Sequence, residues 1–371
     1  MSEYMKLEDF LKELYDKKGS DLFITVNIPP SIKCQGVLLP LNDQNLTPEQ
    51  TRELIFSAMS VPQQEEFLSS HECNFALQLP DIGRYRASAF MQRSHVSAVI
   101  RRIESVIPTL ENLQMPKALE DLALAQRGLV IVVGATGSGK STSLAALIGH
   151  RNANSKGHII TIEDPIEYVH PHQGCIVSQR EVGIDTQSFE VALKNTLRQA
   201  PDVILIGEIR TAETMGYAIN FAETGHLCLA TLHANNANQA LDRIIHFFPS
   251  NLHQQILMDL SLNLKGIVAQ QLLPTVEGGG RIAAVEVLLN SPLVSEHIRK
   301  AEVELLKNLM AKSNELGMQT FDQALFQLHF QEKISYETAL KHADSENDLR
   351  LMIKLAKGSS GGASNLSLTR Q

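Results

Sequence analysis

Residues 134–141, Gly-Ala-Thr-Gly-Ser-Gly-Lys-Ser, constrain the fold of this chain more than any other segment. They fit the pattern GxxxxGK followed by Ser or Thr, and they directly follow an apolar run, residues 129–133, that predicts a buried strand. Behind them, Leu144, Leu147 and Ile148 recur at the spacing of one helical face. This order of strand, loop and helix is typical of a phosphate-binding loop, in which glycines let successive backbone N–H groups point at an anion.

The same segment defines the predicted ATP site. In this pattern Lys140 reaches the β- and γ-phosphates, and the hydroxyl of Ser141 binds Mg²⁺. The predicted nucleotide-binding residues of the segment are Gly134, Ala135, Thr136, Gly137, Ser138, Gly139, Lys140, Ser141 and Thr142. The alternative is a glycine-rich turn without a ligand, and the preceding strand argues against it.

Length and composition limit the class of protein. A chain of 371 residues has room for about two domains with ordinary cores. The formal net charge of −8 argues against a nucleic-acid backbone as the main partner, because that affinity comes from massed lysine and arginine. No stretch approaches the roughly eighteen apolar residues that span a bilayer, and the acidic start is unlike a signal peptide. We therefore expect a cytoplasmic protein.

The cysteines are far apart in the sequence and form no CxxC pair. They are Cys34, Cys73, Cys175 and Cys228. We expect reduced, mostly buried thiols rather than a zinc site or a disulfide framework.

Residues 1–104 have the pattern of a small α/β domain. Leu7, Phe10, Leu11 and Leu14 form a helical stripe, and a second helix is predicted after Thr47 by a cap, a proline and an early acid. The segments expected to form strands are 21–26, 32–39, 75–79 and 84–90, the last two joined by a hairpin turn at 80–83.

The rest of the chain is organised around the phosphate-binding loop. Residues 105–118 are the expected linker, and residues 119–290 the expected RecA-like core, in which strands alternate with helices as in a parallel sheet. The expected strands are 129–133, 158–163, 203–207 and 226–232, followed by a hairpin over 270–289 that turns at 278–280. A helical region, 291–357, should follow, and the glycines and serines from Gly358 predict a disordered tail, 358–371.

Two acids follow strands of the predicted parallel sheet. Glu163 ends one strand and Glu208 follows another, at the edge where such sheets collect ligand groups. ATP hydrolysis needs one carboxylate near Mg²⁺ and another that aligns the attacking water. Both acids are therefore predicted to be catalytic, with Glu208 also beside the metal. Gly207 occupies the position where an aspartate usually ends the second strand, so Glu208 must take its place.

Histidines and arginines are less specific signals. His226 and His233 bracket the fourth strand, and their odd separation argues against a shared metal. His233 could sense the γ-phosphate, or both could be structural histidines; spacing does not decide between these. The arginines of the first domain are Arg84, Arg86, Arg93, Arg101 and Arg102. They fit either a solvated edge strand or a set of arginine fingers that closes on a nucleotide.

Four ordered segments resemble the signature boxes of the secretion-type ATPases. They are the loop at 134–141, the acidic box at 161–170, the segment 202–210 and the histidine box at 224–233. Residues 19–25 and 29–36 resemble the PAS-like domain of the twitching-motility subfamily, the PilT/PilU class. The resemblance implies an α/β fold in which a PAS-like N-terminal domain precedes a RecA-like P-loop ATPase domain and a helical C-terminal region. It also implies a homo-hexamer that uses ATP and Mg²⁺ to power retraction of type IV pili.

Within this class, residues 232–242 and 343–350 are most similar to the accessory, PilU-like motors. The main PilT-like motors carry an Ala-Ile-Arg-Asn-Leu-Ile-Arg-Glu motif, from which residues 295–302 depart. This departure implies a PilT-like sister ATPase as a partner, together with the pilus machinery at the cytoplasmic face of the inner membrane. Arg210-Thr211 stands where the family usually has Arg-Asp, which could alter the surroundings of magnesium.

The resemblance also implies roles for single residues. By position, Glu163 is the catalytic carboxylate and Glu208 the Walker B acid. His226 and His233 are groups of the histidine box, with His226 expected to bind the nucleotide and His233 to take part in catalysis. It further implies that Arg86, Arg93 and Arg101 face the nucleotide held by their own chain, a choice that the residues alone did not allow.

Three other functions compete with pilus retraction. Extension motors of the same superfamily typically carry an extra N-terminal region and a tetracysteine zinc site, which this sequence does not show. A RecA-like nucleic-acid translocase is disfavoured by the negative charge and the absence of tryptophan. A regulator that binds ATP without hydrolysing it is disfavoured by the presence of Lys140, Ser141, Glu163 and Glu208.

Overall fold

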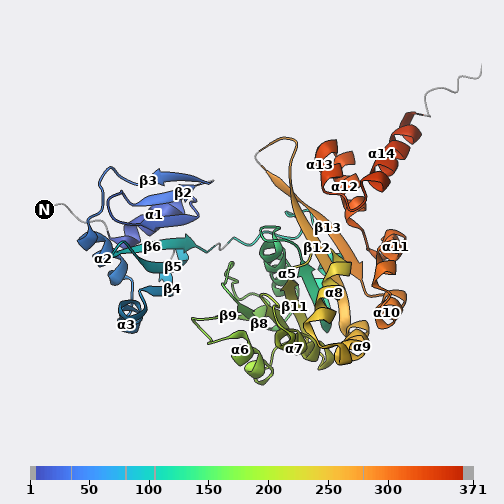
Figure 1. The fold of residues 1–371 in the computed structure, drawn as a ribbon, viewed down its shortest axis with the longest axis horizontal. Coiled ribbons are helices and arrows are strands. Elements are labelled where there is room, and N and C mark those ends of the chain that lie inside the picture. Colours follow the sequence, from blue (N-terminus) through green and yellow to red (C-terminus); the bar gives the residue numbers. More distant parts are fainter. Residues whose placement is uncertain (1–5, 35, 80–81, 104–105, 279, 362–371) are drawn as a thin grey trace, which may run out of the picture. The chain divides into compact units, whose positions relative to one another are not determined.

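The computed structural model describes residues 6–34, 36–79, 82–103, 106–278 and 280–361 (Figure 1). The chain divides into two units. The first is Met1–Val106 with Ile166–Val169, and the second is Ile107–Pro165 with His170–Gln371. None of the described helices is both long and apolar enough to cross a bilayer.

The first unit contains, among its described residues, a six-stranded antiparallel sheet in the order β3-β2-β1-β6-β5-β4. Its strands are β1 Asp21–Ile24, β2 Ser31–Cys34, β3 Val37–Pro40, β4 Glu72–Leu79, β5 Gly83–Gln92 and β6 His95–Arg102. Its helices are α1 Leu7–Asp16, α2 Pro48–Ser57 and α3 Val61–Ser70. The predicted stripe of α1 is buried in the core of this unit, and Thr47 caps α2 by accepting a hydrogen bond from the backbone N–H of Gln50. Both helix predictions are confirmed.

Two predictions for the first unit are wrong. Residues 32–39 form two strands rather than one, because Gly36 has a left-handed φ of 85° that turns the chain between β2 and β3. The arginine-bearing strands β5 and β6 lie inside the sheet, so these arginines do not protect an edge. Helix α3 and strand β6 were not predicted from the sequence. Residues 80 and 81 of the predicted hairpin turn, and residues 104 and 105 near the predicted linker, lie outside the described residues.

The second unit contains, in its described part, a seven-stranded sheet in the order β13-β12-β7-β11-β10-β8-β9. Its strands are β7 Gly128–Val133, β8 Gly157–Glu163, β9 Cys175–Glu181, β10 Val203–Ile206, β11 Leu227–Leu232, β12 Leu264–Pro274 and β13 Arg281–Leu289. All neighbours pair in parallel except β12 and β13, which form an antiparallel hairpin. The predicted parallel sheet and hairpin are confirmed; β9 was missed, and residue 279 of the hairpin turn lies outside the described residues.

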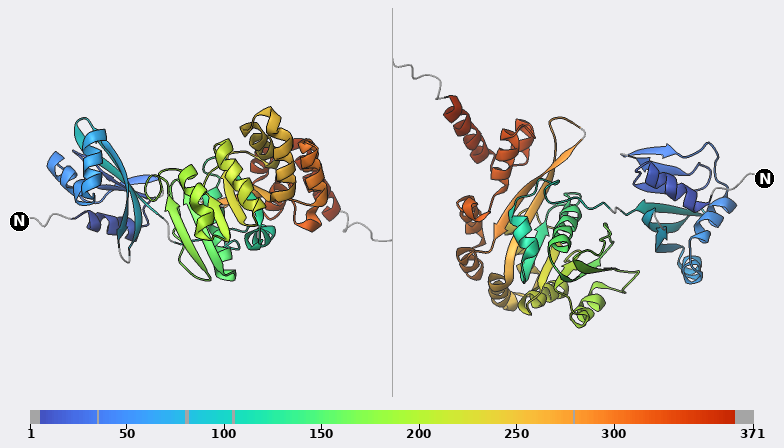
Figure 2. Two further views of the ribbon diagram at one scale, coloured as in Figure 1. Left: turned by 90° about the horizontal axis from the view of Figure 1, so that it is seen from below. Right: turned by 180° about the vertical axis from the view of Figure 1, so that it is seen from behind.

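Helices cover both faces of this sheet (Figure 2). The helices of the second unit are α4 Ala118–Leu124, α5 Lys140–Asn154, α6 Phe189–Thr196, α7 Ala212–Glu223, α8 Ala237–Phe247, α9 His253–Asn263, α10 Pro292–Arg299, α11 Leu306–Ala311, α12 Phe321–Phe330, α13 Tyr336–Lys341 and α14 Glu346–Gly361, with short 3₁₀ turns η1 Leu197–Gln199, η2 Ser250–Leu252, η3 Val303–Leu305 and η4 Asn314–Leu316. Alternate residues of β7 point to opposite faces: Val130 and Val132 pack with α4 and α5, and Leu129 and Ile131 with the helices of the other face.

The last helix overlaps the predicted tail. Helix α14 continues to Gly361, so the expected disorder is wrong for residues 358–361. Extending an existing helix costs less than starting one, because each added residue that is ordered gains a hydrogen bond. Residues that are poor helix formers can therefore continue the last turn. Residues 362–371 of the predicted tail lie outside the described residues.

Candidate active site

The phosphate-binding loop follows β7, whose six residues are all buried. Gly134 has a φ of 153°, and a Cβ atom there would lie 2.4 Å from Oγ of Ser138 and 2.5 Å from the carbonyl oxygen of Gln270. Only glycine fits this position. Ala135, Thr136 and Gly137 are exposed at the tip of the loop, whereas Ser138 turns back into the protein.

Helix α5 begins at Lys140, directly after the loop. Its N-cap residue is Gly139, which has a left-handed φ of 90° and offers no side chain to cap the helix. The ammonium group of Lys140 donates hydrogen bonds to the carbonyl oxygens of Gly134 (2.8 Å) and Ala135 (3.0 Å). The lysine therefore lies over its own loop, where phosphate oxygens can replace the carbonyl oxygens as acceptors.

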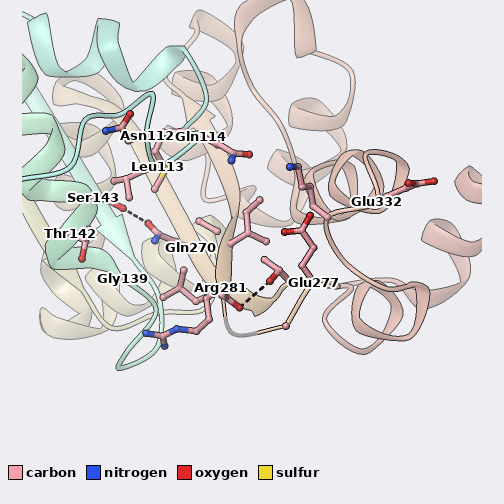
Figure 3. Close-up of a pocket in the computed structure, with 18 residues that line it drawn as sticks. Asn112, Leu113, Gln114, Gly139, Thr142, Ser143, Gln270, Glu277, Arg281 and Glu332 are labelled. Carbon is pink, nitrogen blue, oxygen red and sulfur yellow. Dashed lines mark hydrogen bonds between the residues drawn. The ribbon is translucent and has the colours of Figure 1, made fainter. Parts of the chain in front are cut away.

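Gln270 supports the loop from β12, and the sequence analysis missed it. The side chain is 2% exposed. Its Nε2 donates to the carbonyl oxygen of Ser138 (2.8 Å), and its Oε1 accepts from the hydroxyl of Ser143 on α5 (2.6 Å) (Figure 3). A single buried amide thus joins the loop and the helix that follows it. No local signal distinguished Gln270 in the sequence, because Gln271 beside it and Lys265 on the same strand are polar as well.

A cavity of about 580 Å³ lies beside the start of α5 (Figure 3). It is lined by Gly139, Thr142 and Ser143, by residues 112–115 and by parts of the β12–β13 hairpin. Cavities of this size accommodate small organic ligands.

Glu163 is the last residue of β8, two strands away from β11 in the sheet. Its Oε1 accepts hydrogen bonds from the hydroxyl of Thr161 (2.6 Å) and from Nε2 of Gln179 (3.1 Å). The sequence analysis missed Gln179 together with its strand, β9.

Glu208 follows β10, between the ends of β8 and β11. Its Oε1 lies 2.9 Å from Nε2 of His233, and its Oε2 lies 2.6 Å from a guanidinium nitrogen of Arg210. The hydrogen bond to Glu208, with its charge, raises the pKa of Arg210. A Cβ atom at Gly207 would lie 3.1 Å from Cα of Glu163, so an aspartate there would press on the neighbouring strand. This contact disfavours any side chain at position 207.

The sheet places four predicted groups along one edge. Strands β7, β11, β10 and β8 are consecutive and parallel, with Val133 beside Leu232 and Ile206 beside Ile162. The loop, His233, Glu208 and Glu163 follow their carboxyl ends in this order. Such an edge is where open α/β sheets bind ligands.

His226 lies at the opposite edge of the sheet. Its carbonyl oxygen accepts the backbone N–H of Gly128, at the start of β7, and its Nδ1 lies 3.1 Å from the hydroxyl of Thr224. Six strand residues separate it from His233, which corresponds to roughly 20 Å. Within this chain His226 therefore lies far from the phosphate-binding loop, and its contact with a nucleotide stays a prediction. Spacing along the sequence did not reveal which end of β11 faces the loop.

The arginines singled out in the first unit lie on β5, on β6 and in the turn between them. Arg86 pairs with Arg101 across the two strands, and Nε of Arg101 donates to Oδ1 of Asp21 (2.8 Å). Arg93 lies in the turn, with a φ of 48°. Their contact with a nucleotide stays a prediction.

The four cysteines are free thiols. Cys73, Cys175 and Cys228 are buried and Cys34 is half-buried, and all four are free. The prediction of reduced, mostly buried thiols is confirmed.

Comparisons with known proteins place this arrangement in context. Residues 71–288 match the family described as "Type II/IV secretion system protein". The chain is 65% identical to the type IV pilus ATPase PilU of Pseudomonas aeruginosa over 367 residues, 99% of this chain and 96% of that protein. It is 38% identical to the type IV pilus retraction ATPase PilT of the same species, over 91% of this chain and 98% of that protein. A crystal structure of the pilus retraction motor PilT with bound ADP matches with a TM-score of 0.88 and 39% identity, over 94% of this chain and all of that one.

Proposed function

The chain belongs to the type II/IV secretion family, in the class of the type IV pilus ATPases PilU and PilT, and on this basis we propose that it is a motor ATPase of pilus retraction. One observation carries the proposal: a phosphate-binding loop, two acids and a histidine follow the carboxyl ends of consecutive parallel strands. This is the set of groups that phosphoryl transfer to water requires.

Each group has a role toward ATP. Backbone N–H groups of the loop and the ammonium group of Lys140 hold the phosphates, and the nucleoside occupies the cavity of about 580 Å³ beside Thr142. Glu163 orients the water that attacks the γ-phosphate. His233, whose Nε2 lies 2.9 Å from Oε1 of Glu208, senses whether the γ-phosphate is bound. The water oxygen bonds to the γ-phosphorus as the bond from that phosphorus to the β–γ bridging oxygen breaks, which releases inorganic phosphate and leaves ADP in the loop.

Mg²⁺ would neutralise the charge that develops on the phosphates. Its residues would be Ser141 and Glu208, and hydroxyl and carboxylate oxygens are the ligands that this hard cation prefers. Both carboxylate oxygens of Glu208 already have a partner: Oε1 lies beside Nε2 of His233, and Oε2 lies beside a guanidinium nitrogen of Arg210. This donor set fits a carboxylate that acts on the metal through a bound water.

The working unit is proposed to be a homo-hexamer at the cytoplasmic face of the pilus machinery. The resemblance of the four boxes to hexameric motors supports this, as does the match to the PilT structure over nearly the whole chain. The higher identity to a PilU (65%) than to the PilT of the same species (38%) supports an accessory motor that works with a PilT-like sister ATPase.

Deletion strains test this function directly. Pilus retraction is measured by twitching in strains that lack this chain, its PilT-like sister, or both. Retraction should weaken without this chain and stop without the sister. Full retraction driven by this chain alone would contradict an accessory role. ATP hydrolysis by the purified chain that rises strongly with single-stranded DNA would instead favour a nucleic-acid translocase.

A further inference from the structure

Three side chains share one face of the sheet where β8 and β9 run side by side. Thr161 and Glu163 are two residues apart on β8, so both point to the same face. Gln179 on β9 is the register partner of Thr161 in the parallel pair. The strand period and the register therefore bring a hydroxyl, an amide and the Glu163 carboxylate together.

Both donors meet the same carboxylate oxygen. The hydroxyl of Thr161 donates to Oε1 of Glu163 at 2.6 Å, and Nε2 of Gln179 donates to the same atom at 3.1 Å. Two donors on one oxygen fix the plane of a carboxylate and thus the direction of its second oxygen.

Gln179 is itself held in one orientation. Its Oε1 accepts the backbone N–H of His170 at 2.8 Å, so the NH₂ end of the amide has to face Glu163. His170 is 9% exposed, and burial lowers its pKa to about 4. The ring is therefore neutral at physiological pH, and it adds no charge to this junction.

We infer that Gln179 is a positioning residue for hydrolysis: it holds the Glu163 carboxylate in the direction from which that group orients the attacking water. The inference rests on the role proposed above for Glu163. Gln179 acts only through Glu163 and makes no contribution to holding the nucleotide. Its loss should therefore lower kcat and leave the affinity for nucleotide unchanged.

Two isosteric variants separate positioning from folding. Gln179→Met removes the hydrogen bond that Gln179 donates to Glu163 and the one that it accepts from the backbone N–H of His170. Gln179→Glu keeps an acceptor for the backbone N–H of His170 but has no donor for Glu163, and it adds a like charge. A matched control is Gln173→Met, an exposed glutamine just before the same strand. Steady-state hydrolysis of Mg–ATP gives kcat and KM, binding of a fluorescent ADP analogue gives Kd, and thermal melting reports the fold.

Both Gln179 variants should lower kcat by about 10- to 100-fold, with KM, Kd and Tm close to wild type. Gln173→Met should match wild type throughout. A kcat within twofold of wild type for Gln179→Glu would overturn the inference. So would a loss of activity accompanied by a tenfold rise in Kd or a clear fall in Tm, because that pattern indicates a structural role.

A parallel measurement on Glu163→Gln distinguishes this inference from the proposed function. If Glu163→Gln is inactive while the Gln179 variants turn over normally, only the role of Gln179 is wrong. If Glu163→Gln itself turns over normally, the proposed role of Glu163 fails, and the inference on Gln179 falls with it.

Discussion

The carboxyl group of Glu286 yields a quantitative prediction about stability. It lies on β13 with 2% of the residue exposed, and its Oε1 accepts a 2.8 Å hydrogen bond from the backbone N–H of Ala237, where α8 begins. Burial raises the pKa of Glu286 from the ordinary 4.5 to about 7. The charge of Asp344 adds to this rise, whereas the hydrogen bond from Ala237 and the charge of Lys307 oppose it.

The sign of the pH dependence follows from where the proton is bound. Between about pH 4.5 and pH 7 the folded chain keeps a proton on Glu286 that the unfolded chain has released. The contribution of this group to stability is therefore largest below pH 4.5, and it falls as the pH rises toward 7. A tenfold change in an equilibrium constant corresponds to about 1.4 kcal/mol, which gives a loss of about 2–3 kcal/mol between pH 5 and pH 8.

Glu286→Gln removes the ionisable group and keeps an oxygen acceptor for Ala237. The difference in unfolding free energy between variant and wild type should shift in favour of the variant by about 2–3 kcal/mol from pH 5 to pH 8. Urea unfolding followed by circular dichroism at both pH values measures it. Glu304→Gln, at an exposed position of the same region, is the control and should show no such shift. If the difference in unfolding free energy between variant and wild type is the same at pH 5 and pH 8, the pKa of Glu286 is not raised by burial.

Three further predictions concern the loop and the thiols. Lys140→Ala should abolish ATP hydrolysis and elute like the wild type in gel filtration, because the ammonium group acts on phosphate rather than in packing; hydrolysis near the wild-type rate would overturn the assignment of the loop. Gln270→Leu should weaken binding of a fluorescent ADP analogue by about 10- to 100-fold, since it leaves the buried carbonyl of Ser138 without its donor; binding within twofold of wild type would show that the loop does not depend on Gln270. In the folded protein a thiol reagent should modify Cys34 well before the buried thiols Cys73, Cys175 and Cys228; equal rates for all four would show that the core opens readily.

The parts of the fold that follow from local pattern were predictable. Strand β7 is buried on both faces and reads as a continuous apolar run, and α1 carries a clear helical stripe, so both were placed from the sequence. Strand β9 was missed because it is an edge strand whose polar residues, among them Gln179 and Arg180, are only partly buried. Its pattern lacks both the apolar run and the strict alternation that indicate a strand.

The residues of the candidate site were predictable only where the local sequence marks them. Lys140, Glu163 and Glu208 could be named because a motif or a strand end marks each of them. Gln270 and Gln179 could not, since their roles arise from the order of strands in the sheet, which brings residues 270 and 138 together across 132 positions of the sequence. The strand order also decides which end of β11 faces the loop, and it thereby separates His233 from His226.

The central claim is that Glu163 performs the hydrolytic step on a nucleotide that the loop binds independently. Glu163→Gln keeps the shape of the side chain but cannot act as a base or strongly polarise water. The measurement is ATP affinity and single-turnover hydrolysis on the same preparation of this variant. We expect affinity within a fewfold of wild type together with loss of turnover. Turnover at the wild-type rate would show that Glu163 is not the catalytic carboxylate, and failure to bind ATP would show that Glu163 serves binding or folding instead.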